Sequence, residues 1–208
     1  MTDRAGCFVV IEGASGIGKT TVAAMLRDEL AHRGFPTLAT KQPSDSALGK
    51  LARQGTDEYR GVVLACLVAA DRYYHVERDI RPALRAGYVV VCDRYVPTSL
   101  VLQRMDGVET DFVEQLNQYA ERPDLTVILT GQPQRSGKRA EDRGIYSRFH
   151  RGGQAARLVE DWLYRDVAQQ LVQAGYAVLH HEVTDQSAEA VTAVVLNAVT
   201  ALLDGHSG

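Results

Sequence analysis

The N-terminal part of the chain contains the stretch GASGIGKT at residues 13–20. It matches the pattern GxxxxGK[ST], in which main-chain N–H groups surround phosphate oxygens, the lysine reaches the β- and γ-phosphates and the hydroxyl binds Mg²⁺. An apolar run, Cys7 to Glu12, precedes the stretch and an amphipathic segment, Lys19 to Arg33, follows it. Because the motif requires this strand–loop–helix context, we expect ATP or a related triphosphate to bind here. The residues expected to contact it are Gly13, Ala14, Ser15, Gly16, Ile17, Gly18, Lys19, Thr20 and Thr21.

Apolar runs of strand length alternate with segments of helix length along the whole chain. The expected strands are Cys7 to Glu12, Thr37 to Thr40, Tyr88 to Asp93, Leu125 to Thr130 and Ala177 to His181. The expected helices are Lys19 to Arg33, Asp57 to Ala86, Asp111 to Tyr119, Ala155 to Ala174 and Ser187 to Leu203. Continuous apolar strands separated by helices are typical of a parallel sheet covered on both faces. We therefore expect a three-layer α/β fold of the P-loop kinase type, with a five-stranded parallel sheet, formed as one domain by residues 1–208.

The segment from Gly131 to Gly153 interrupts this alternation. It is rich in Arg, Lys and Gly and holds few residues that could enter a core. A polar insertion of this length in a compact domain is usually functional or mobile. We interpret residues 131–153 as a basic lid over the phosphate site.

Bulk composition limits the classes of partner. The formal net charge is -3, whereas proteins that bind nucleic-acid polymers usually carry a strong positive excess. The three cysteines, Cys7, Cys66 and Cys92, lack the number and spacing of a disulfide framework or a zinc site. No apolar stretch approaches the length required by a membrane span or fits a signal peptide. We expect small-molecule partners, no nucleic-acid polymer, no membrane attachment and a cytoplasmic location.

A second polar group follows the expected strand that begins at Tyr88. Asp93 and Arg94 stand at the carboxyl end of this strand, the edge at which open α/β sheets bind ligands. Asp93 could bind Mg²⁺ or its water molecules, and the planar guanidinium of Arg94 could hold the phosphate of an acceptor. A structural ion pair at a strand end is the alternative interpretation.

Three further segments carry a family resemblance. They are IRPALRAGYVVVCDRYVPTSL at 80–100, followed by Gln103, then AADR at 69–72 with His75, and PDLTVIL at 123–129. Together with the P-loop they resemble, in order and over most of the chain, the thymidylate kinases. The resemblance implies phosphoryl transfer from ATP to a nucleoside monophosphate, and it implies a homodimer.

The resemblance also implies roles for single residues. Arg72 corresponds to a residue that contacts the acceptor base, Ser99 and Gln103 to residues at the polar edge of that base, and Arg94 to one that binds the 5′-phosphate. Tyr164 matches a tyrosine on the helix after the lid. Because Ala14, Ser15 and Ile17 supply no basic residue to the P-loop, positive charge for the transition state must come from elsewhere, and lid arginines are the natural source. Arg139 and Arg143 are the candidate catalytic residues there, beside Lys19, Asp93 and Arg94.

Several acceptor-side positions depart from the family pattern. Ser15 replaces a usual acidic residue, the run KQPSDS beginning at Lys41 and containing Pro43 replaces REPGGT, Val68 replaces a phenylalanine that stacks on thymine, and Leu102 replaces a tyrosine near the sugar. The donor side is intact. The expected acceptor is therefore dTMP or a related, even modified, pyrimidine nucleotide.

Three alternatives remain open at this point. A nucleoside kinase would need a carboxylate base after the second strand, where this chain has Gln42, although Asp93 could substitute. A nucleotide-operated regulatory protein would need a switch region that the sequence does not show. A degenerate kinase that binds nucleotides without turnover would fit the altered acceptor residues, but Lys19, Thr20, Asp93 and Arg94 are all present.

Overall fold

Five strands form a single sheet. The computed structural model describes residues 5–132, 148–151 and 153–205. Its strands are β1 (Cys7–Gly13), β2 (Thr37–Lys41), β3 (Val89–Asp93), β4 (Leu125–Thr130) and β5 (Val178–Glu182). They lie in the order β2-β3-β1-β4-β5, and every neighbouring pair is parallel. The expected α/β fold with a five-stranded parallel sheet is confirmed.

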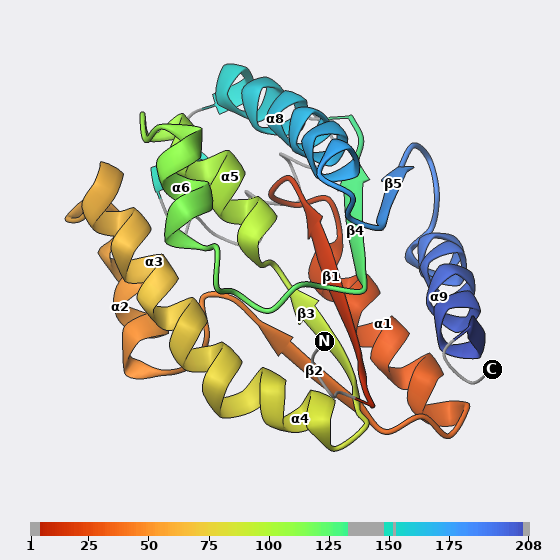
Figure 1. Ribbon diagram of the computed structural model, residues 1–208. Coiled ribbons are helices and arrows are strands. Elements are labelled where there is room, and N and C mark those ends of the chain that lie inside the picture. The colour runs from red at the N-terminus through yellow and green to blue at the C-terminus, as the bar shows by residue number, and fades with distance from the viewer. Residues whose placement is uncertain (1–4, 133–147, 152, 206–208) are drawn as a thin grey trace.

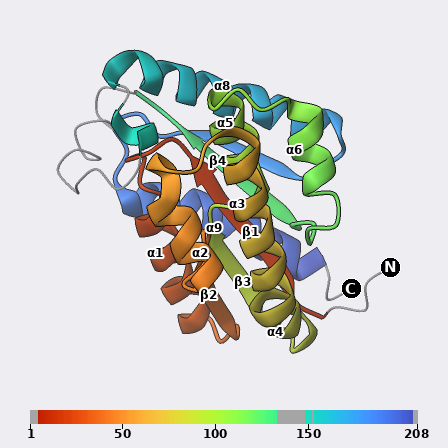
Figure 2. The ribbon, with the colours of Figure 1, turned by 90° about the vertical axis from the view of Figure 1, so that its left-hand side faces the viewer.

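Helices cover both faces of this sheet (Figures 1 and 2). The α-helices are α1 (Lys19–His32), α2 (Ala47–Gln54), α3 (Gly61–His75), α4 (Arg81–Arg85), α5 (Val96–Met105), α6 (Thr110–Leu116), α8 (Gly153–Gln173) and α9 (Ala188–Gly205). The shorter turns are η1 (Gly55–Asp57), η2 (Val76–Ile80) and η3 (Arg148–Arg151). Helices α1 and α9 pack on one face, and α4, α5, α8 and the η2 turn pack on the other.

Strand β1 explains why the sheet is apolar on both sides. Val9 and Ile11 belong to the core beneath α1 and α9, whereas Phe8 and Val10 pack with the η2 turn and α4. Successive side chains of a strand point to opposite faces, so a strand covered on both faces is a continuous apolar run. Glu12 follows this alternation onto the face of Phe8 and Val10 and is fully buried.

The prediction of one long helix from Asp57 to Ala86 is wrong. This segment contains α3, a π turn at Val76–Ile80 and α4. The wider π turn lets His75, Val76 and Ile80 all face the interior, where each is at most 1% exposed. Helices α2 and α5 were not predicted. Ser46 caps α2 by accepting from Gly49 N at 3.0 Å, which is a local signal for the start of a helix.

Helix α9 qualifies as a possible membrane span by length and composition alone, with a mean hydropathy of 1.4 over its 18 residues. The expectation that no stretch reaches such a length is therefore wrong for this helix. Its buried residues Val191, Val195 and Val199 pack with Leu26 and Leu30 of α1, so one side of α9 forms part of the core.

Candidate active site

The site lies where the strand order reverses. β1 is flanked by β3 and β4, and in open α/β sheets ligands bind at the carboxyl ends of strands beside such a switch point. Ile11 is aligned with Asp93 across the β1–β3 pair. The loop after β1 and the residues after β3 therefore occupy neighbouring positions at the same edge of the sheet.

The loop from Gly13 to Lys19 has the backbone that a phosphate cradle requires. Gly13, Gly16 and Gly18 have φ values of 139°, 81° and 112°, a region that L-residues with side chains rarely adopt. At Gly13 a Cβ atom would also lie 2.2 Å from the carbonyl oxygen of Leu129. Gly18 precedes α1 without a side-chain cap, so the first N–H groups of the helix are left for an anion.

Lys19 is folded over this loop. Its side chain is buried, and Nζ donates to the carbonyl oxygen of Ala14 at 2.8 Å. Burial and, next, repulsion by Arg94 lower the pKa of Lys19 to about 7, against the attraction of Asp93, Glu160 and Glu12. A polyphosphate bound in the cradle would add negative charge and raise this pKa again.

Thr20 and Asp93 form a pair of oxygen ligands. Thr20 Oγ1 donates to Asp93 Oδ2 at 2.5 Å. The other carboxylate oxygen, Asp93 Oδ1, is buried and has no hydrogen-bond partner in the described part of the chain. Hydroxyl and carboxylate oxygens suit Mg²⁺, which keeps several water molecules and is usually completed by substrate phosphates. These residues therefore fit the metal that a P-loop kinase uses.

Glu12 is a site residue that the sequence analysis missed. Its carboxylate accepts from Tyr95 N at 2.6 Å, from Thr98 Oγ1 at 2.6 Å and from Thr98 N at 3.3 Å. Burial raises the pKa of Glu12, while the Thr98 hydroxyl and the charge of Arg94 lower it. The carboxylate thereby fixes the start of α5 beneath the site. An acid at the end of an apolar strand, directly before a P-loop, was the available signal.

Arg94 is held in an unusual backbone conformation above Glu12. Its φ is 72°, which is the left-handed region that non-glycine residues seldom occupy. Its guanidinium approaches Thr98 Oγ1 and Tyr164 Oη, each at 3.4 Å. Tyr164 is fully buried and supports Arg94 rather than lining the cavity described next. The contacts aim the guanidinium of Arg94 into the site.

The cavity beside Arg94 encloses about 430 Å³. It is bounded by the end of β3, the loop after β2, α3 and α5, and it reaches Thr20 and Asp93. Eight of the acceptor-side residues singled out in the sequence line it, whereas Ser15 and Tyr164 do not. The eight are Lys41, Pro43, Val68, Arg72, Arg94, Ser99, Leu102 and Gln103. The structure therefore brings residues from four separate segments to one cavity next to the P-loop.

Arg72 is engaged mainly by the protein itself. It is 1% exposed, and Nε donates to Gln42 Oε1 at 2.9 Å, while Nη2 donates to Ser99 Oγ at 2.8 Å. Further donations go to Asn117 Oδ1 and to the carbonyl oxygen of Tyr95. The sequence suggested an arginine that contacts the acceptor base. The geometry shows one whose fork also orients the hydroxyl of Ser99.

Phe149 is a second residue of the site that the sequence analysis missed, because it lies in the segment interpreted as a polar lid. The preceding Arg148 is anchored to the carbonyl oxygen of Thr56 and to Asp106, each at 2.5 Å. Its guanidinium lies 4.3 Å from the centre of the Phe149 ring. The anchor places this ring at the cavity. Arg139 and Arg143 lie outside the described residues.

Ser15 contacts a carboxylate instead of supplying one. Its main-chain N and its Oγ donate to Glu160 Oε1 at 3.1 and 3.2 Å. Glu160 belongs to α8 and is 4% exposed. The acidic group that family members commonly carry in the P-loop therefore has a counterpart from another helix.

A chain that cradles a polyphosphate after β1 and presents an arginine to a second anion after β3 is built for phosphoryl transfer between the two. The fold and the site thus define a P-loop nucleotide phosphotransferase. The sequence model of the family described as thymidylate kinase matches residues 11–187. The chain therefore belongs to the thymidylate kinase family, which acts on small nucleotide substrates.

Curated relatives agree with this membership. A probable thymidylate kinase of Staphylothermus marinus is 37% identical over 182 residues, which cover 86% of this chain and 88% of the relative. A probable thymidylate kinase of Pyrococcus horikoshii is 40% identical over 152 residues, 69% of this chain and 74% of the relative. One of Caldivirga maquilingensis is 34% identical over 158 residues, 74% and 77% of the two chains. The expected phosphotransferase assignment is confirmed.

Proposed function

We propose that the protein transfers the γ-phosphoryl group of ATP to dTMP, giving ADP and dTDP. The observation that carries this proposal is the lining of the cavity beside Arg94. It joins Thr20 and Asp93, next to the P-loop, to Ser99 and Gln103 of α5. A nucleoside monophosphate fits this arrangement with its phosphate at Arg94 and its base toward α5.

The chain needs little covalent chemistry for this reaction. A phosphate oxygen of the acceptor forms the new P–O bond as the bond to the ADP oxygen breaks, and a phosphate monoester is already largely ionised at neutral pH. Lys19 holds the β- and γ-phosphates, and Arg94 holds the acceptor phosphate in line. Thr20 and Asp93 would hold Mg²⁺, which neutralises developing phosphate charge. Positioning and charge neutralisation supply the catalysis.

Ser99 and Gln103 match the edge of a thymine base. Ser99 Oγ accepts from Arg72, so its own hydroxyl hydrogen remains to be donated to a carbonyl oxygen of the base. Gln103 Oε1 is buried without a hydrogen-bond partner among the described residues, and it can accept from the N3–H of thymine. A base that presents a donor beside a carbonyl acceptor therefore satisfies both side chains.

The donor base has a separate crevice. It lies between the P-loop and the start of α9 and is lined by Gly16, Gly18, Thr21, Val183, Gln186 and Ser187. We assign the adenine to this crevice because it adjoins the cradle on the side opposite Asp93. We also propose the basic segment 131–153 as the source of positive charge for the transition state; its candidate residues Arg139 and Arg143 lie outside the described residues. Within this segment, Gly131 N donates to Asp161 Oδ1, and Arg148 donates to the carbonyl oxygen of Thr56 and to Asp106.

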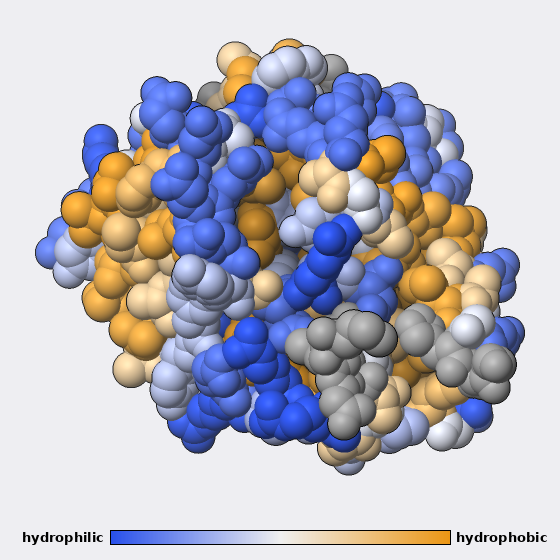
Figure 3. Space-filling view, viewed as in Figure 1, coloured by the Kyte–Doolittle hydropathy of each residue, from blue (hydrophilic) through white to orange (hydrophobic). Residues whose placement is uncertain are grey.

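An apolar stripe on α3 supports the proposed homodimer. Val62, Val63, Cys66, Ala70 and Tyr74 recur at helical spacing and are exposed. Figure 3 shows apolar residues gathered over α2 and α3. An apolar patch of this kind marks a protein contact. The proposal includes a cytoplasmic location and no membrane or nucleic-acid polymer as partner. A Val63→Glu variant that sediments as the wild type does would contradict the dimer surface.

The nucleoside kinase alternative is disfavoured by Gln42. Its Oε1 accepts from Arg72 and its Nε2 faces His75, so it is committed to the protein and cannot serve as a base. A coupled assay of ADP release separates the possibilities. We expect turnover with dTMP, little with thymidine, and loss of most turnover in Lys19→Ala with the fold retained. Turnover with thymidine but not dTMP, or full activity of Lys19→Ala, would refute the proposal.

A further inference from the structure

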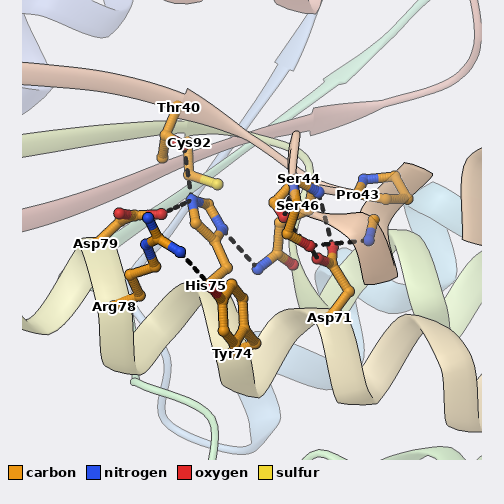
Figure 4. A network of polar contacts seen from close by, with 12 residues as sticks. Thr40, Pro43, Ser44, Ser46, Asp71, Tyr74, His75, Arg78, Asp79 and Cys92 are labelled. Carbon is orange, nitrogen blue, oxygen red and sulfur yellow. Dashed lines mark hydrogen bonds and ion pairs between the residues drawn. The ribbon is translucent and has the colours of Figure 1, made fainter. Parts of the chain in front are cut away.

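His75, the last residue of α3, is 1% exposed and contacts Gln42, which lines the acceptor cavity. Its Nε2 is 2.7 Å from Thr40 Oγ1 and 3.9 Å from Asp79 Oδ2. Its Nδ1 is 3.2 Å from Gln42 Nε2. Figure 4 shows the ring with one edge toward Thr40 and Asp79, between β2 and the helix. Both ring nitrogens are therefore engaged by side chains from different elements.

The position of the ring proton follows from Arg72. A guanidinium can only donate, so the Gln42 atom that receives Arg72 Nε–H must be the carbonyl oxygen. The amide nitrogen of Gln42 then faces His75 and donates to Nδ1, which must carry no proton. The proton of the neutral imidazole is on Nε2 and is donated to Thr40 Oγ1. Each member of the row Thr40–His75–Gln42–Arg72 thus fixes the hydrogen-bond direction of the next.

We infer that His75 is a positioning residue of the acceptor site, which in its neutral Nε2–H form holds Gln42 and Arg72 in the orientation that presents Ser99 to the base. The inference rests on the proposed acceptor cavity. Arg72 is the link, because the same guanidinium that donates to Gln42 Oε1 also donates to Ser99 Oγ. His75 itself does not line that cavity.

Protonation of His75 would break this order. An Nδ1–H would face the NH₂ group of Gln42, so the amide would have to rotate and turn its NH₂ group toward Arg72 Nε–H. Two buried donors would then oppose each other.

Charged groups near the ring are Asp79 on η2, Asp71 and Arg72 on α3, and Asp45 in the loop after β2; Cys92 on β3 is also near. Burial lowers the pKa of His75 more than these acids raise it, so the neutral form prevails at pH 7.

The pH dependence of acceptor binding tests this inference, with Gln42→Glu as the matched variant. A carboxylate at position 42 can accept from Arg72 and from a protonated His75 together. In the wild type we expect KM for dTMP to rise roughly 3- to 10-fold as His75 becomes protonated below pH 6.5, whereas KM for ATP should change with pH equally in the wild type and in Gln42→Glu. In Gln42→Glu the rise in KM for dTMP should be absent. The dTMP phosphate titrates in the same range, but it does so equally with both proteins.

A spectroscopic measurement separates failure of the inference from failure of the proposed function. Long-range ¹H–¹⁵N correlation spectra of the nucleotide-free protein at pH 7.5 report which nitrogen of His75 carries the proton. The inference requires Nε2–H, whether or not dTMP proves to be the acceptor. His75→Asn, whose Oδ1 can replace Nδ1, should retain dTMP affinity better than His75→Gln. An Nδ1–H ring, or parallel pH profiles for wild type and Gln42→Glu, would overturn it.

Discussion

The Thr20 hydroxyl donates to the Asp93 carboxylate over 2.5 Å, although 73 positions separate the two residues in the chain. The contact joins the first turn of α1 to the last residue of β3. It exists because β1 and β3 are neighbours in register, so that the loop after one strand meets the end of the other. The ATP side and the acceptor side of the site therefore meet at the contact between Thr20 and Asp93.

Asp93→Asn tests the metal assignment. The substitution keeps the shape of the side chain but removes the negative charge that attracts Mg²⁺. It also places an NH₂ donor where one carboxylate oxygen now accepts. We expect the Mg²⁺ concentration for half-maximal activity to rise about 10- to 100-fold, with unfolding stability near that of the wild type. Initial rates across a Mg²⁺ titration at saturating nucleotides measure this shift. An unchanged titration midpoint would exclude Asp93 from the metal site.

The lowered pKa of Lys19 predicts proton uptake on ATP binding. With a pKa of about 7 in the free protein, the amine is mostly neutral at pH 8. The triphosphate favours the ammonium form, so binding should take up roughly 0.9 proton per ATP at that pH. Calorimetry in buffers of different ionisation enthalpy measures this number. Lys19→Arg is the control, because arginine is always protonated and its variant should take up almost none.

The P-loop and the strands could be predicted from the sequence more directly than the helices around them. The motif and the apolar strand before it depend on neighbouring residues, so the cradle and the strand positions could be read directly. Glu12 and Phe149 were missed because their placement depends on partners distant in sequence. Glu12 contacts Tyr95 and Thr98 at the start of α5, and Phe149 follows Arg148, which is held by Thr56 and Asp106. The break of the long helix at Val76–Ile80 likewise follows from tertiary burial of His75, Val76 and Ile80.

Arg94 should be needed for activity, although its backbone conformation lowers the stability of the fold. Its φ of 72° costs an L-residue about 1–2 kcal/mol relative to glycine. Arg94→Ala keeps this penalty and Arg94→Gly removes it. Both variants should lose on the order of 100-fold or more in kcat because the acceptor phosphate loses its guanidinium. Urea unfolding should nevertheless find the glycine variant more stable than the alanine variant. Equal stability of the two would show that the backbone is not strained.

Ser15→Asp restores the acidic residue that the family commonly has in the P-loop, yet it should be harmful here. The new carboxylate would lie against Glu160, which now accepts from Ser15 N and Oγ at about 3 Å. Like charges at this separation raise a carboxyl pKa and destabilise the fold, by about 1–3 kcal/mol near neutral pH. Adding Glu160→Gln should recover most of that loss in thermal or urea unfolding. A double variant no more stable than Ser15→Asp would contradict the pairing.

The aromatic face for the acceptor base should come from Phe149. Val68 stands at the position where the family resemblance implies a stacking phenylalanine. Phe149, on η3, lines the same cavity as Val68. Stacking of a base on an aromatic ring contributes about 1–3 kcal/mol. Phe149→Ala should therefore raise KM for dTMP by about 5- to 100-fold and leave KM for ATP unchanged. Phe112→Ala is the control, because Phe112 lies on α6 outside the cavity.

The double variant Val68→Phe, Phe149→Ala should regain much of the lost affinity, since one ring would replace the other. If Phe149→Ala and Phe112→Ala gave the same KM for dTMP, the base would have to be held by Arg72, Ser99 and Gln103 without an aromatic partner.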